Sequence, residues 1–151
     1  TGMVGFRMMY VEKKHAKSAW VSSSSTTTEK PWGYETSWAG FSGVHGKTLF
    51  IRKGERTSFK YNRSKTEILM LRSGSAQVLF GDELSLEDPL GHPMKQETMS
   101  PGDTLLVQSS CPYRITALEN CEIFEIGNNS QEKPVRIEDD YGRVKKDAEN
   151  A

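Results

Sequence analysis

The chain has 151 residues and a mass of 17.0 kDa, a size that suits one domain with a buried core. Its 20 Lys and Arg residues balance 20 Asp and Glu residues, so no broad field attracts nucleic acid or an anionic membrane. No apolar run approaches the roughly 18 residues of a membrane span. We therefore expect a soluble, cytoplasmic protein with no nucleic-acid or membrane partner, and free thiols at Cys111 and Cys121, which lack a CxxC spacing.

The first 28 residues precede the expected domain. Residues 1–21 mix apolar side chains with lysines, and the tract SSSSTTT at residues 22–28 is typical of a linker. We interpret 1–28 as an N-terminal arm and Ser/Thr linker. The arm could be a loose tail, a strand or helix donated to a neighbouring subunit, or a short basic amphipathic helix.

Short extended segments then recur every eight to twelve residues, separated by turns with glycine or proline. The expected strands cover residues 33–38, 48–52, 57–61, 68–71, 75–81, 97–99, 104–107, 111–118 and 121–126. Residues 82–95 are predicted to form a surface loop, and the segment FSGVHG a glycine-rich loop in which His45 is solvated or locally bonded rather than a metal ligand.

No long helical period occurs before residue 130, so the pattern predicts an all-β fold. We expect a double-stranded β-helix, that is a jelly-roll barrel, over roughly residues 33 to 127. The charged C-terminal stretch predicts a short helical or irregular segment. The domain is expected at 29–145 and a tail at 146–151.

The segment from Gly54 to Gly74, GERTSFKYNRSKTEILMLRSG, carries the most specific pattern. The spacing of Gly54, Glu67 and Gly74 resembles the first motif of the cupin superfamily, in which a glycine is followed by His-x-His, a glutamate and a second glycine. Lys60 and Asn62 stand at the two histidine positions. A second motif fits at Pro101 and Gly102, with Tyr113 in place of its histidine.

Two further stretches, KPWGYE and RIEDDYGR, are similar to the opening and closing signatures of the mannose-6-phosphate isomerase branch of cupins. That branch includes the C-terminal domain of mannose-1-phosphate guanylyltransferases, and the likeness covers roughly residues 29 to 145. The resemblance implies a ligand set of Lys60, Asn62, Glu67 and Tyr113. An ammonium group repels a metal cation, so we expect neither a metal nor another cofactor.

Two functions remain open at this point. The first is a degenerate, non-catalytic cupin that binds a sugar or sugar phosphate, or that acts as a dimeric interaction module. The second is a metal-independent isomerase or epimerase of sugar phosphates or nucleotide sugars, with Lys60 and Glu67 as catalytic residues. The candidate substrate-binding residues are Asn62, Lys65, Tyr113, Trp32 and Arg143.

Each assignment has a structural alternative. Lys60 and Glu67, expected on adjoining strands, could form an internal ion pair that replaces the metal. Trp32 and Tyr141 could be packing residues, and Arg143 could pair with Asp139 or Asp140 in a surface clasp. A homodimer is expected, because a small sandwich has edge strands to cover and the N-terminal arm offers one more strand.

Overall fold

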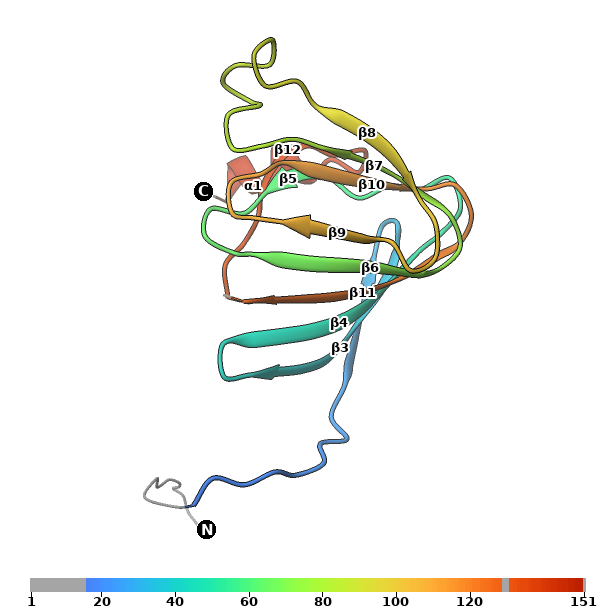
Figure 1. Ribbon diagram of the computed structural model, residues 1–151, viewed down its shortest axis with the longest axis vertical. Helices are drawn as coiled ribbons and strands as arrows, with labels where there is room; N and C mark the ends of the chain where they lie inside the picture. Colours follow the sequence, from blue (N-terminus) through green and yellow to red (C-terminus); the bar gives the residue numbers. More distant parts are fainter. Residues whose placement is uncertain (1–15, 129–130, 151) are drawn as a thin grey trace.

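The computed structural model describes residues 16–128 and 131–150, which form two antiparallel β-sheets facing each other (Figure 1). The six-stranded sheet has the order β2 (Thr26–Lys30), β3 (Gly33–Phe41), β4 (Val44–Ile51), β11 (Cys121–Asn128), β6 (Glu67–Ser73), β9 (Thr104–Val107). The five-stranded sheet has the order β12 (Val135–Glu138), β5 (Phe59–Tyr61), β10 (Tyr113–Ala117), β7 (Ala76–Phe80), β8 (Lys95–Met99). This is the jelly-roll barrel that the sequence predicts.

The core forms because each central strand has one apolar face. In β6, the side chains of Glu67, Leu69 and Leu71 are buried, whereas Ile68 and Arg72 are exposed on the other side. Leu69 and Leu71 pack between the sheets with the side chains of Ile51, Val78, Ile115 and Ile123. Each such buried side chain contributes about 1.5–3 kcal/mol, so the interior of the barrel away from the mouth is the main source of stability.

Two turns show how the sequence sets the strand connections. Ser42 and Gly43, with φ of 52° and 78°, form a two-residue turn between β3 and β4, so the FSGVHG segment is a tight hairpin rather than the expected loop. Gly74 joins β6 to β7 at a φ of 92°, and a Cβ there would lie 2.1 Å from the Asn120 carbonyl oxygen. Only glycine fits this position, which explains the second glycine of the motif.

The structure changes the expected boundaries at both ends. Thr26, Thr27 and Thr28, assigned to the linker from composition, belong to β2 and pair with β3. The helix α1 (Arg143–Glu149) extends into the expected tail and lies beside β12 (Figure 1). Residues 1–15 lie outside the described residues, and 16–25 contain neither helix nor strand, so a subunit-swapped arm remains a prediction.

Other expectations are confirmed. Residues 81–94 form the long connection between β7 and β8 without a strand, and Cys111 and Cys121 are free thiols. Among the described residues, no helix has the length and apolar character needed to cross a bilayer.

Candidate functional site

A cavity of about 190 Å³ opens between the two sheets at one end of the barrel. Its walls come from β2, β3, β4, β6 and β11 on one side and from β5, β10 and β12 on the other. The charged side chains in the described wall are the cations Lys30, Lys47, Lys60, Lys65, Arg136 and Arg143 and the acids Glu35, Glu67, Glu125 and Glu132. A cavity so rich in charge is suited to a polar ligand and not to an apolar one.

Glu67 is the fixed centre of this wall. Its Oε1 accepts hydrogen bonds from the Tyr113 hydroxyl at 2.6 Å and from Asn62 Nδ2 at 3.2 Å, and its Oε2 lies 3.2 Å from Lys65 Nζ. All four side chains are buried. The structure thus brings together Asn62, Lys65, Glu67 and Tyr113 of the predicted site, and both carboxylate oxygens already have partners.

The Lys60 side chain makes no ion pair with Glu67 and contacts this network at the Tyr113 ring. Strands β5 and β6 belong to opposite sheets rather than adjoining ones, and the buried ion pair of Glu67 is with Lys65, not with Lys60 as expected. Lys60 Nζ lies 4.8 Å from the centroid of the Tyr113 ring. Burial lowers the pKa of the Lys60 ammonium, although nearby Glu67 and Glu125 oppose this shift.

The other cations of the described wall have carboxylate partners. Their nearest pairs are Lys30 with Glu35 at 3.8 Å, Lys47 with Glu35 at 2.8 Å, Lys65 with Glu67 at 3.2 Å, Arg136 with Asp147 at 3.0 Å and Arg143 with Asp139 at 2.7 Å. Within residues 16–128 and 131–150, no such ion pair involves Lys60. Lys60 is therefore the cation of the described wall that has no ion-pair partner.

The sequence interpretation missed a second polar cluster on the inner face of β4 and β11. His45 is buried in β4, not in a loop, and its Nε2 lies 2.8 Å from Glu125 Oε2. Burial opposes ionisation of Glu125, but the His45 hydrogen bond and the charges of Lys47 and Lys65 outweigh it and lower its pKa to about 2. Lys47 has its own pKa raised, since Glu125 and Glu35 outweigh its burial.

A signal for this cluster was present in the strand periodicity. In β11, Cys121, Ile123, Glu125 and Gly127 share the inward face, so Glu125 occupies a position where an apolar residue is expected. His45 and Lys47 share the inward face of β4 with Leu49 in the same way. Gly127 also leaves room for the imidazole, because a Cβ there would lie 2.6 Å from His45 Cε1.

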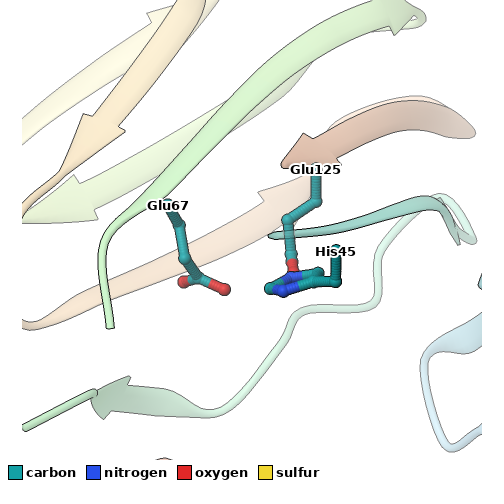
Figure 2. Close-up of side chains that lie close together, drawn as sticks. All are labelled: His45, Glu67 and Glu125. Carbon is teal, nitrogen blue, oxygen red and sulfur yellow. The ribbon is translucent and has the colours of Figure 1, made fainter. Parts of the chain in front are cut away.

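His45, Glu67 and Glu125 lie close enough together to be considered as ligands of one metal ion. One donor atom from each lies within 4.8 Å of the others, and Figure 2 shows Glu67 and His45 pointing toward one another with the Glu125 carboxylate beside the imidazole. His45 Nδ1 has no hydrogen-bond partner in the described part of the chain. However, Lys65 already pairs with Glu67, and Lys47 lies 4.0 Å from Glu125.

These lysines make the donor set a poor fit for a resident divalent cation. A metal would have to displace two ammonium groups from their carboxylates or bind beside them. At the positions where the cupin motif has histidines, Lys60 and Asn62 supply no imidazole. A metal-free site therefore stays a prediction.

The remaining predicted residues have structural contacts. Trp32 is buried and packs in the core while reaching the cavity wall. Arg143 donates to both carboxylate oxygens of Asp139, and Arg56 does the same to Asp140. The Tyr141 hydroxyl donates to Glu55 Oε1 at 2.6 Å, and burial together with this bond raises its pKa to about 12. The RIEDDYGR stretch thus ties the C-terminal segment to residues just before β5.

Comparison with known proteins supports the fold. No family model and no curated protein matches the sequence. Solved structures of cupin fold do match: a variant of oxalate decarboxylase from Bacillus subtilis has 16% identity and a TM-score of 0.62 over 78% of this chain. The capsular polysaccharide assembling protein CapF from Staphylococcus aureus has 11% identity and a TM-score of 0.62 over 78% of this chain. KdgF from Halomonas sp. has 12% identity and a TM-score of 0.59 over 75%.

The matches differ in how much of the other protein they include. The chain spans about a third of the first two proteins, 31% and 35%, but 94% of KdgF. At these identities the likeness establishes the cupin fold alone. The specific resemblance to mannose-6-phosphate isomerases stays an expectation from the sequence.

Proposed function

We propose that this protein is a degenerate, non-catalytic cupin that binds a small anionic carbohydrate, of the sugar-phosphate class, in the cavity between its sheets. The observation that carries this proposal is the unneutralised ammonium of Lys60 in a wall whose other described cations are paired. Burying a charge without an ion-pair partner is costly, and burial outweighs the nearby charges of Glu67 and Glu125 and lowers the pKa of Lys60. An anion beside Lys60 Nζ would offset that cost, and binding would raise the pKa again.

The size of the cavity limits the ligand. At about 190 Å³ it is smaller than the roughly 300–1,000 Å³ of pockets that enclose drug-sized molecules. It can enclose a phosphate group or part of one sugar, whereas a nucleotide sugar would have to leave most of its atoms outside. The acids and amides of the wall, including Glu35 and Asn62, can hydrogen-bond sugar hydroxyls.

One of the structural neighbours points the same way. CapF is described as a capsular polysaccharide assembling protein, so it is a protein of cupin fold whose description refers to carbohydrate. That likeness supports the carbohydrate part of the proposal only as an analogy of fold.

A metal-independent isomerase is the second candidate, and one observation favours it. The lowered pKa of Lys60 increases the fraction of neutral amine, which is the form that can accept a proton from a substrate. Against it, Glu67 cannot serve freely as the base, because Tyr113, Asn62 and Lys65 hold both its oxygens. The binding function requires no such mobility.

Two measurements test the proposal together. In thermal denaturation, mannose 6-phosphate should raise the melting temperature, while mannose should not. A ligand at ten times its Kd stabilises the folded state by about 1.4 kcal/mol, which is a few degrees. Lys60→Met should abolish the shift, and Lys53→Met, which removes an exposed lysine outside the cavity, should not.

The second measurement is proton exchange at the sugar C2 carbon in D2O, followed by NMR. Exchange catalysed by wild type and lost in Lys60→Met would favour the isomerase. A wild type that neither shifts with any sugar phosphate nor exchanges the proton would reject both functions.

A further inference from the structure

The outer face of the six-stranded sheet is unusually apolar. The apolar residues on it are Tyr34, Trp38, Phe41, Val44, Phe50, Ile68, Met70, Leu106, Phe124 and Ile126. Seven of them are exposed, from 39% for Tyr34 to 72% for Leu106. We refer to these ten residues as the outer apolar face.

The strand register makes this face continuous. Ile68 is paired with Leu106 on one side and with Ile126 on the other, and Ile126 is paired with Gly46. Trp38 lies over Gly46, where a Cβ would be 2.4 Å from its ring. The indole also makes an edge contact with Phe124 at 6.0 Å between centroids. The apolar surface therefore crosses the sheet from β9 to β3 without a gap.

No helix, strand or loop of the described chain packs over the centre of this face, although the Arg72 guanidinium lies over the Phe124 ring, 5.9 Å from its centroid. The helix α1 lies beside β12 of the other sheet (Figure 1). Trp20 of the preceding segment touches Phe41 at 5.3 Å between ring centroids, but it is itself 65% exposed. It extends the apolar surface at one end and leaves the centre, at Ile68 and Ile126, open.

The exposed area is that of a protein interface. Seven apolar residues with these fractional exposures present about 600 Å² of apolar surface, at the upper limit for patches on monomers. One partner in an interface of standard size contributes about 800 Å². A second copy of the same face, with Trp20 and the polar rim, would supply that area.

The charges on the face also fit a second copy. Among the described strands, the charges of this face lie at one end: Arg72 and Glu122 pair with each other at 3.6 Å, and Glu29 of β2 lies opposite Tyr34. Its centre has no charge, so two copies related by a two-fold axis meet without like-charge repulsion. Because the face lacks a cluster of lysines or arginines, it does not suit an anionic membrane.

We propose that the protein forms a homodimer in which the outer apolar faces of two copies pack against each other, sheet on sheet. This differs from the edge-strand or arm-mediated dimer expected from the sequence. Two twisted sheets pack face to face at about 10 Å when their side chains interdigitate, as the aromatic and β-branched residues here allow.

Sedimentation velocity over a concentration series, with the full chain, tests the proposal. Wild type should be a dimer. Ile68→Lys/Ile126→Lys places like charges at the two-fold centre and should raise the dimer Kd at least about tenfold, with the circular dichroism spectrum unchanged. Leu86→Lys/Leu90→Lys adds the same charge at exposed positions of the β7–β8 connection and should leave the dimer intact.

If the lysine variant does not fold, Ile68→Thr/Ile126→Thr is the second test, because it keeps β-branched side chains that suit a strand. This variant should also raise the dimer Kd. A wild type that stays monomeric at all concentrations would overturn the proposal. A monomer that sediments with anionic lipid vesicles would overturn it as well. A dimer that both face variants leave unchanged would also overturn it and would favour pairing through edge strands or the arm.

Discussion

Substitution of Glu67 by glutamine probes the polar network at the base of the cavity. Glutamine retains one oxygen that can accept hydrogen bonds from Tyr113 and Asn62. Its amide nitrogen, however, would face Lys65 Nζ, which in the wild type lies 3.2 Å from the Glu67 carboxylate. Lys65 is only 8% exposed and would lose its counter-charge. Breaking a buried pair in this way costs roughly 3–5 kcal/mol. For a domain of this size, that lowers the melting temperature by roughly 6–20 °C.

The assay is urea denaturation of wild type, Glu67→Gln, Lys65→Met and the double variant. The double variant removes both charges. Its loss of unfolding free energy should be smaller than the sum of the two single losses by at least about 1 kcal/mol. Glu119→Gln is the matched control, because its pair with Lys53 is exposed, lies outside the outer apolar face and should contribute less than about 1 kcal/mol. A Glu67→Gln protein as stable as wild type would refute the structural role of the pair.

The other predictions concern acid and metal. The pKa of Glu125 is about 2 in the folded protein, compared with 4.5 for an ordinary glutamate. Its ionised form therefore stabilises the protein above pH 4.5 by on the order of 3 kcal/mol. This contribution should disappear as the pH falls from about 4.5 to 2. The unfolding free energy of Glu125→Gln should therefore depend less on pH over that range than that of wild type, and equal slopes of unfolding free energy against pH would contradict this prediction. Elemental analysis of purified protein should find much less than one zinc, iron or manganese per chain, and stoichiometric metal would overturn the metal-free site.

Local pattern predicts much of the fold because strand alternation is a local property. Residues 104–107 were predicted as a strand and form β9, and the apolar run at 68–71 lies within β6. Composition was misleading at Thr26, Thr27 and Thr28. These threonines suggested a linker, but threonine is β-branched and suits a strand, and pairing with β3 orders the segment.

The site was predicted only in part because its geometry depends on pairings distant in sequence. Asn62, Lys65, Glu67 and Tyr113 came from motif spacing, and the structure brings them together. The spacing could not tell that β5 and β6 lie in opposite sheets, which separates Lys60 from the ion pair of Glu67. The contact of His45 with Glu125 joins residues 80 positions apart, and no local pattern specifies it.

The role of Lys60 as the anion-binding group is tested most directly by calorimetric titration of chelator-treated protein with mannose 6-phosphate. We expect saturable binding that survives chelation, weakens at least about tenfold in Lys60→Met and is unchanged in Lys53→Met. Because burial lowers the pKa of Lys60, its charge and the affinity should be lost at a pH below 10.5, where an ordinary lysine loses its proton. Binding that requires an added metal, or that Lys60→Met leaves intact, would contradict the proposed site.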